Sequence, residues 1–492
     1  MRNGPIRSWS RITVLILWIA TGIFTGCSHP GLGSGEQVAQ LPENPRIFPD
    51  YIGVTVPPNI APLNFIVKED GRQFMARWEG YDGMVVESSS KEGVFRIPMG
   101  QWKKLTEGSR GNSLKVTIYR KDRDSWSAYP SFLVYIASEE IDPYLVYRLI
   151  PPGYETWSEM GLYQRNLSTF REKPLIENVN VEENCVNCHS FNQGNSDEVL
   201  FHIRGSMGGT MIGKEGNIEK VDLKREESLS AGVYPSWHPS GNYITFSTNR
   251  IEQYFHARPG KSIEVLDRQS DLILYHLESG EVTHVPGTED DAFMETYPTW
   301  SPDGRWLYFS RADADADTPF DSIRYDVFRI AFDPAKGSFR GDPECVFQAT
   351  AQGRSASFPR ISPDGRYLLC TVHAYGTFPI WHKEADLCLV DLSNGSWEIP
   401  EGINSDDTES FHSWSANTRW VVVSSRRDDG RYTKPYISYF DEKGHFQKAF
   451  LIPRRNPVSY DLMITSFNRP ELITGPVEIS SRRWIRAAKM GL

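Results

Sequence analysis

The residues with the most specific chemistry in this sequence are Cys185-Val186-Asn187-Cys188-His189. Two thiols three positions apart can each add to a vinyl group of haem, and the histidine that follows then lies beneath the iron as its proximal ligand. The motif therefore predicts one covalently bound haem c, held by Cys185, Cys188 and His189. A disulfide or redox pair and half of a zinc site are the alternatives. No second Cys-x-x-Cys accompanies the motif.

A second axial ligand would have to reach the opposite face of the haem. His202 lies 13 residues beyond His189, and a chain of that length spans roughly 40 Å when extended. Met207, Met211 and Met160 are also within reach. We prefer His202 as the metal ligand, because residues 200–203 form a strand-like run that would hold it rigidly. A polar role for His202 at a sheet edge remains the alternative.

Arg204 follows His202 by two residues, so the two side chains are expected on one face of a strand. A guanidinium group there could pair with a haem propionate, which makes Arg204 a candidate cofactor-binding residue. Asp313, Asp315 and Asp317 alternate like calcium ligands, but they lack the glycine and the distal glutamate of an EF-hand loop. A solvated acidic loop is the favoured interpretation, and no catalytic triad or phosphate-binding loop is evident.

The first 27 residues have the pattern of an export signal. Three arginines among the first eleven residues precede a mostly apolar run at 12–24 and then Thr25-Gly26-Cys27. This segment resembles a bacterial lipoprotein signal, which implies lipidation of Cys27 and a periplasm-facing location, with the outer membrane favoured. A transmembrane anchor or an ordinary cleaved signal is the alternative, although the apolar run is short for a span. Residues 28–48 are expected to form a flexible tether.

Three of the six cysteines are left after Cys27 and the haem motif are assigned: Cys345, Cys370 and Cys388. An odd number cannot be fully paired. Cys370 and Cys388 fall in two strand-like runs that are expected to be neighbours. A disulfide between them and two buried free thiols are both open.

An internal repeat organises the C-terminal part of the chain. Its copies share a pattern that is Tyr-Pro-Thr-Trp-Ser-Pro-Asp-Gly in the copy around Trp300. The other copies are marked by Trp237, Ile361 and a degenerate Trp414, so the spacings are 63, 61 and 53 residues. Repeats of this length, each with several short strands, are typical of propeller blades.

The turn Ser-Pro-Asp-Gly joins antiparallel strands, and a four-stranded blade must pack against neighbours in a closed ring. The repeats resemble the TolB-type, WD-like propeller family over residues 195–492, which implies a β-propeller with six blades favoured and five as the alternative. Residues 49–170 alternate like strands and predict a β-sandwich-like domain, although 156–167 has a helical pattern. Residues 171–212 would form a short haem-binding segment, and the fold class is all-β.

The whole assembly resembles uncharacterised exported Bacteroidetes proteins that combine a haem motif with TolB-like blades. A net charge of −10 argues against nucleic acid as a partner. Three functions compete: a periplasmic electron carrier that docks a redox protein partner on the propeller, a protein- or glycan-binding module with a structural or sensory haem, and a haem redox enzyme such as a peroxidase or oxyanion reductase. The carrier is favoured, because one haem without a second cofactor motif suits one-electron transfer. Whether the chain is an enzyme stays open.

Overall fold

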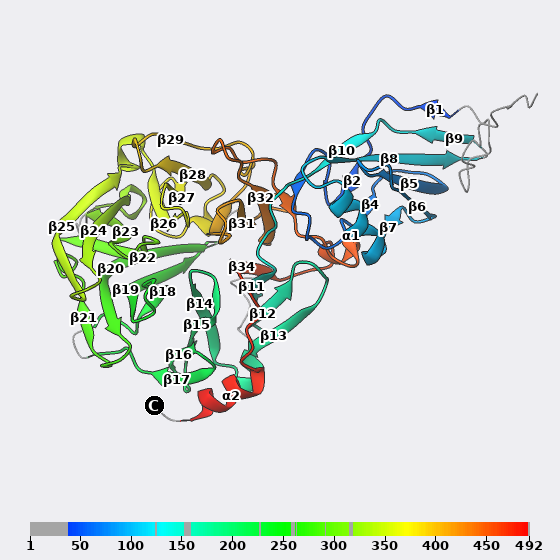
Figure 1. Cartoon of the computed structure of the whole chain (residues 1–492). Coiled ribbons are helices and arrows are strands. Elements are labelled where there is room, and N and C mark those ends of the chain that lie inside the picture. The colour runs from blue at the N-terminus through cyan, green and yellow to red at the C-terminus, as the bar shows by residue number, and fades with distance from the viewer. Residues whose placement is uncertain are drawn as a thin grey trace, which may run out of the picture.

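The computed structural model describes residues 38–123, 125–151, 159–225, 228–256, 261, 263–290, 292–313 and 318–490. Within these residues the strands form eight sheets, of which six have four strands each. Figure 1 shows the six four-stranded sheets in a ring, with a β-rich N-terminal domain beside it. The expected all-β class with a propeller is confirmed, and the blade count is six.

In blades 1 to 5 the chain passes through four consecutive strands, from the innermost strand at the central axis to the outermost strand. Blades 1 to 3, written from the innermost strand, are β14 (Cys185–Asn192), β15 (Asn195–Arg204), β16 (Gly209–Lys214) and β17 (Asn217–Val221); β18 (Val233–Trp237), β19 (Tyr243–Phe255), β20 (Ile263–His276) and β21 (Val282–His284); and β22 (Phe293–Trp300), β23 (Trp306–Asp313), β24 (Asp326–Asp333) and β25 (Ser338–Phe347). Blades 4 and 5 are β26 (Ser355–Ile361), β27 (Tyr367–His373), β28 (Asp386–Asp391) and β29 (Trp397–Glu398); and β30 (Glu409–Trp414), β31 (Trp420–Ser425), β32 (Lys434–Tyr439) and β33 (Phe450–Leu451). Four 3₁₀ turns lie between strands of this region: η2 (Phe320–Ser322), η3 (Thr350–Gln352), η4 (Pro379–Trp381) and η5 (Pro457–Tyr460).

Blade 6 closes the ring with strands from distant parts of the sequence. Its innermost strand is β34 (Ser466–Ile473), which pairs antiparallel with β11 (Tyr144–Ile150); β12 (Gly161–Asn166) and β13 (Glu172–Glu177) complete the sheet. The helical pattern predicted across 156–167 is wrong for 161–166, because pairing on both sides with β11 and β13 imposes a strand there. The strands β11 and β12, which the sequence groups with the N-terminal domain, thus form part of the propeller.

The turn after the innermost strand is fixed by a serine side chain in blades 3, 4 and 5, whereas His238 takes that position in blade 2. Ser301 donates a hydrogen bond from Oγ to Asp303 Oδ1 at 2.6 Å and accepts one from Trp306 N at 3.0 Å. Gly304 then adopts a φ of +69°, which favours glycine. In the degenerate fourth copy, Asn417 accepts the same bond from Ser415 at 2.6 Å, so the turn survives the loss of Pro, Asp and Gly.

The N-terminal domain is the expected β-sandwich-like unit. A seven-stranded sheet contains β1 (Ala39–Gln40), β3 (Thr55–Val56), β5 (Gln73–Glu79), β6 (Val85–Ser90), β8 (Ser113–Asp122), β9 (Ser125–Ala128) and β10 (Phe132–Ile136), and a three-stranded sheet contains β2 (Ile47–Phe48), β4 (Phe65–Val67) and β7 (Val94–Phe95). Trp78 contacts Phe65 and Phe95 with ring centroids 6.0 Å apart, which packs one sheet on the other. The helix α1 (Met99–Gly108) buries Trp102 in this core.

The N-terminal domain and the propeller share one continuous hydrophobic cluster, which runs from Trp78 to Trp420 in blade 5. Tyr51 also donates a hydrogen bond to the Leu451 carbonyl at 3.3 Å. The C-terminal helix α2 (Ser481–Lys489) lies beside β13 and β17, at the bottom of Figure 1, and packs Trp484 against Phe201 of blade 1.

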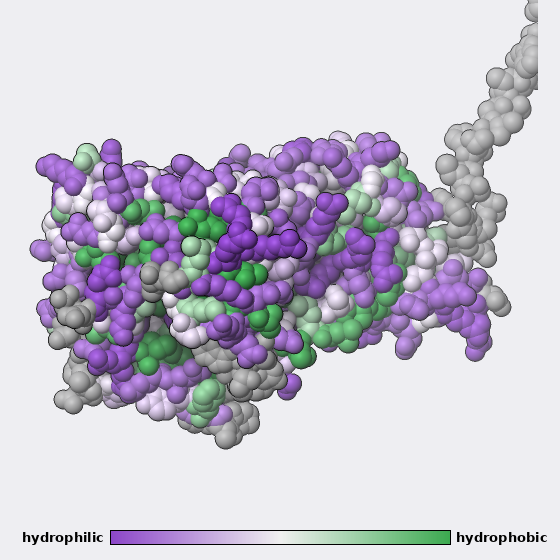
Figure 2. Space-filling model, turned by 90° about the horizontal axis from the view of Figure 1, so that it is seen from below, coloured by the Kyte–Doolittle hydropathy of each residue, from purple (hydrophilic) through white to green (hydrophobic). Residues whose placement is uncertain are grey.

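The face of the molecule drawn in Figure 2 is mostly hydrophilic, with hydrophobic residues in separate patches. No helix within the described residues is long and apolar enough to cross a membrane.

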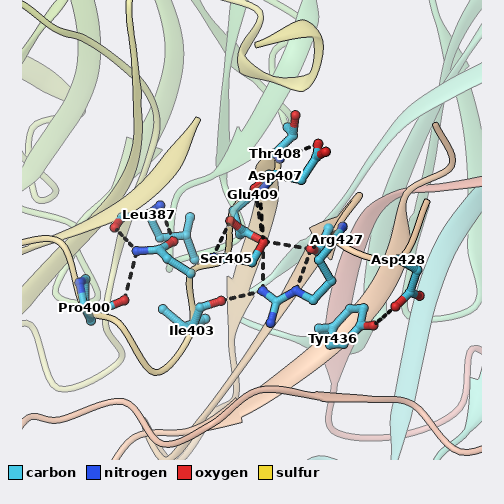
Figure 3. Close-up of polar contacts among 12 residues, drawn as sticks. Leu387, Pro400, Ile403, Ser405, Asp407, Thr408, Glu409, Arg427, Asp428 and Tyr436 are labelled. Atoms are coloured by element: carbon cyan, nitrogen blue, oxygen red, sulfur yellow. Dashed lines mark hydrogen bonds and ion pairs between the residues drawn. The ribbon is translucent and has the colours of Figure 1, made fainter. Parts of the chain in front are cut away.

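A buried ion pair fastens the start of β30 to the end of β31, as Figure 3 shows. The Arg427 guanidinium donates to Glu409 Oε1 at 2.8 Å and to the Ile403 carbonyl at 2.6 Å. Glu409 is fully buried, and its carboxylate also accepts hydrogen bonds from Ser405 and Ser425. Burial raises the pKa of Glu409, and the Arg427 charge opposes this shift.

We expect Arg427→Met to lower the free energy of unfolding by about 2–4 kcal/mol, because a buried carboxylate loses its cation. The double variant Arg427→Met/Glu409→Gln should lose less than the sum of the two single variants, since no unpaired charge remains. Urea unfolding followed by tryptophan fluorescence measures both quantities.

The matched control is the Arg366–Asp391 pair of blade 4, where the arginine side chain is 53% exposed. Arg366→Met should cost much less than Arg427→Met, because an exposed ion pair contributes little to stability. Equal costs for Arg427→Met and Arg366→Met would contradict a structural role for the buried pair.

Candidate functional site

The motif residues 185–189 lie in β14, the innermost strand of blade 1. Asn184 fixes the start of this strand: its Nδ2 donates to the Val181 carbonyl of η1 (Asn178–Val181) at 2.8 Å, and its Oδ1 accepts from Met207 N at 3.1 Å. Residues 185 to 192 are all buried. The motif is therefore an integral part of the propeller and shares the ladder of β15.

A β-bulge divides the motif. Between Asn187 and Ser190 the register of β14 against β15 shifts, so Cys188 and His189 together oppose one residue, and Cys188 takes a φ of +51°. The other five innermost strands have the same shift with a positive φ, at Tyr234, Tyr297, Phe358, Phe411 and Arg469. Cys188-His189 thus occupies the place that the repeat fills with Tyr-Pro or Phe-Pro.

The six bulge residues approach one another at the axis of the propeller. The rings of Tyr234 and Tyr297 have centroids 4.6 Å apart, and those of Tyr297 and Phe358 are 3.9 Å apart. Arg469 lies over the Tyr234 ring at 5.8 Å. Cys188 is therefore one member of a group of side chains that fills the centre of the ring.

The two motif thiols are free, buried and electrostatically different. Burial raises the pKa of Cys185, against the charges of Arg148 and Arg204. Burial also opposes ionisation of Cys188, but Arg469, Arg204 and the Tyr234 backbone together lower its pKa below the usual thiol value. Cys188 is thus the thiol with more thiolate character, the form that acts as a nucleophile.

His189 is 1% exposed, and neither of its ring nitrogens forms a hydrogen bond of good geometry, although the Arg469 backbone lies close enough to the ring to oppose the lowering of its pKa. Burial, reinforced by the Arg469 and Arg148 charges, lowers its pKa well below that of an ordinary histidine, so the ring is neutral. His412 occupies the same part of the bulge in blade 5, and there Nε2 bonds to the Leu369 carbonyl at 3.0 Å. A histidine at this position of the repeat can therefore form a hydrogen bond.

His202 lies opposite Asn187 in the ladder and faces blade 2, where its ring packs on Phe246 with centroids 5.8 Å apart. Its Nδ1 shares a 2.8 Å hydrogen bond with Thr210 Oγ1, whereas Nε2 has no partner. Burial lowers the pKa of His202 to about 3, so this ring is neutral too. His189 packs instead near Phe191, whose cluster joins blade 1 to blade 6, so the structure does not bring the two imidazoles together.

Arg204 is exposed and is the cross-strand partner of Cys185. Together with His202, Gly205 and Tyr234 it lines a cavity of about 520 Å³ between blades 1 and 2. The thiols and His189 do not line this cavity.

The other candidate ligands lie apart from one another. Met211 is fully buried, Met207 is half-buried beside Asn184, and Met160 is buried at the start of β12. No group of three His, Cys, Asp or Glu side chains in the described part of the chain could hold a metal ion.

Other residues singled out in the sequence have simpler surroundings. Cys370 and Cys388 are direct partners in the ladder of β27 and β28 and are free thiols, as is the exposed Cys345. Cys27 lies outside the described residues, as do Asp315 and Asp317.

Two residues of this site lie outside the motif, and the motif gave no indication that they belong to the site. Arg148 of β11 and Arg469 of β34 come from opposite ends of the sequence, yet both influence Cys188 and His189. Neither forms an ion pair with a described acidic residue, and Arg469 Nη1 is buried without a partner. Aligning Arg469-Pro470 with the Tyr-Pro pair of the repeat would have placed Arg469 at the axis.

Two motif thiols and an unpartnered imidazole among guanidinium groups fit the attachment of haem c by their chemistry. The thiols are free, the imidazole is neutral and guanidinium groups suited to propionates are present, but the thiols and the imidazole are all buried, so attachment would require β14 to be exposed.

No protein-family model and no curated protein matches the chain. Solved structures with a similar arrangement include TolB from Acinetobacter baumannii, at 13% identity and a TM-score of 0.43, covering 76% of this chain and 85% of TolB. The Dos1 propeller matches at 12% identity and a TM-score of 0.30, covering 77% of this chain and 92% of its own. An oligogalacturonate lyase from Vibrio parahaemolyticus matches at 11% identity and a TM-score of 0.33, covering 61% of this chain and 92% of its own. Similarity this low carries no information on activity, and the propeller fold rests on the six sheets themselves.

Proposed function

We propose that this chain is a periplasmic mono-haem c-type cytochrome that transfers electrons, with haem bound through Cys185 and Cys188 and with His189 as the proximal ligand. The observation that carries the proposal is the pair of unpartnered, buried nitrogens of His189. A buried polar group without a partner is costly, so such a group calls for an explanation. At the equivalent position of blade 5, His412 bonds through Nε2 and leaves only Nδ1 without a partner, so His189 differs from it by one nitrogen.

The residues around the motif have distinct parts in this proposal. Cys188, with its lowered pKa, supplies the more reactive thiol, and Cys185 the second attachment point. Arg204, Arg148 and Arg469 provide positive charge for the two propionates. Haem, when bound, supplies one-electron redox chemistry, whose potential depends on the axial ligands and on burial.

His202 is the second axial ligand in this proposal. Its Nδ1 is engaged by Thr210, which leaves Nε2 as the free nitrogen, and an outer hydrogen bond of this kind is what orients ligating histidines. Because His202 and His189 have different neighbours in the structure, ligation by both requires the bulge of β14 to rearrange around the haem. A carrier needs both axial positions filled, whereas an enzyme needs one open.

The proposal places the protein in the cell envelope, anchored through lipid on Cys27. Two acyl chains give stable attachment to a membrane, and the segment 28–48 would tether the folded domains to it. A redox partner protein would then dock on the propeller. The second candidate function is a binding module with a sensory haem, which is favoured by a cavity of about 430 Å³ where the innermost strands of all six blades end.

Haem staining of denaturing gels tests the attachment. Wild-type protein exported in a host that matures c-type cytochromes should stain, because thioether bonds survive denaturation. Cys185→Ala/Cys188→Ala should not stain, whereas the matched buried pair Cys370→Ala/Cys388→Ala should stain like the wild type. An unstained wild type, or a stained motif variant, contradicts the proposal.

The absorption and electron paramagnetic resonance spectra of the ferric protein test the second ligand. We expect a low-spin, bis-histidine iron in the wild type and a high-spin iron in His202→Ala. Met207→Leu, Met211→Leu and Met160→Leu should leave the spectrum unchanged, as should His238→Ala in blade 2. A methionine–iron signature removes His202 as the ligand, and a high-spin wild type favours the enzyme over the carrier.

Membrane fractionation tests the anchor. Wild-type protein should sediment with membranes and incorporate labelled fatty acid, and Cys27→Ala should be released as soluble protein. Cys345→Ala is the control and should remain in the membrane fraction. Soluble wild-type protein that retains an unmodified Cys27 contradicts the anchor.

A further inference from the structure

A cavity of about 430 Å³ opens where the six innermost strands end, so it lies on the propeller axis beyond the bulge residues. We call it the funnel. All six blades contribute to its lining, among them Trp237, Trp300, Trp414, Arg360, Ser413 and Glu471. A cavity of this volume suits a small organic molecule.

Arg360 brings an unpaired positive charge to the funnel. The side chain comes directly after the bulge of β26 and forms no hydrogen bond or ion pair with a described residue. Burial lowers its pKa to about 10, against the attraction of Glu471, so the guanidinium remains charged at neutral pH. A partly buried cation without a close anion is unfavourable unless a ligand compensates it.

Glu471 does not provide that compensation. Its Oε1 accepts a hydrogen bond from the Phe191 backbone at 3.0 Å, which directs the carboxyl group toward blade 1. Burial raises the pKa of Glu471, and the Arg360 charge, the Phe191 backbone hydrogen bond and the Arg469 charge oppose this shift.

The tryptophans of the funnel supply apolar walls. Trp300 and Trp414 are 6% and 8% exposed, and the Nε1 atoms of both indoles are buried inside the wall, away from the cavity. Trp237 donates from Nε1 to the Ser190 carbonyl of the neighbouring blade at 3.3 Å. The unpaired polar group that lines the cavity is thus the guanidinium of Arg360.

We propose that the funnel binds a small carboxylate-bearing ligand, with the carboxylate on Arg360 and the body of the molecule among the tryptophans. The carboxylate could belong to a sugar acid or to the C-terminus of a short peptide. This binding requires no haem, so it can be tested independently of the cytochrome function.

Isothermal titration calorimetry on the full-length protein tests the proposal with two pairs of probes. Glucuronate is compared with glucose, and an N-acetylated tripeptide is compared with its C-terminal amide. We expect at least one acid to bind, and its neutral counterpart to bind about tenfold more weakly or not at all. The acid that binds identifies the source of the carboxylate.

Arg360→Gln should weaken the binding acid by about tenfold or more, and Arg360→Lys should weaken it less, because the charge is kept. Arg305→Gln is the control: this arginine belongs to the neighbouring turn and is 74% exposed, so affinity should not change. Thermal unfolding checks that each variant is folded. Binding of neither acid, equal binding of acids and neutral analogues, or full affinity in folded Arg360→Gln overturns the proposal.

Discussion

The six innermost strands share one constraint, an extra residue that forces a positive φ at the propeller axis. Non-glycine residues rarely adopt this conformation, and it persists only where packing compensates it. Here the compensation comes from the contacts among the bulge residues, such as the tilted ring pair of Tyr297 and Phe358. Because these side chains fill the centre, they separate Cys185, at the start of β14, from the funnel beyond the ends of the innermost strands, with Cys188 in the barrier itself.

Several arginine side chains lie near the bulge residues, although the whole chain carries a net charge of −10. Arg148, Arg360 and Arg469 all influence His189, which lies within the bulge itself. A net charge describes solubility and long-range attraction, whereas the field at a buried site depends on the few charges close to it. The chemistry available along the axis is therefore that of anions and neutral ligands, in a protein that is acidic on average.

The sequence predicted best those features that depend on residues close to one another in the chain. The turn Ser301-Pro302-Asp303-Gly304 recurs with its own hydrogen bonds, so the blades could be recognised one repeat at a time. Cys185, Cys188 and His189 were recognisable because their spacing is a motif. Arg148 and Arg469 were not, because only the pairing of β11 with β34 brings them to the thiols, and strand-like β12 carried a misleading helical pattern.

Closure of the ring by β34 also sets an order of events for the growing chain. The motif is made nearly three hundred residues before Arg469 and Glu471, whose strand is the last to join the propeller. Before that strand pairs with β11, the side of β14 that faces blade 6 can be covered only by β12, and in the closed ring His189 is 1% exposed. If a bulky group is joined to these residues as we propose, its attachment must therefore precede closure of the ring, and folding and modification would be coupled.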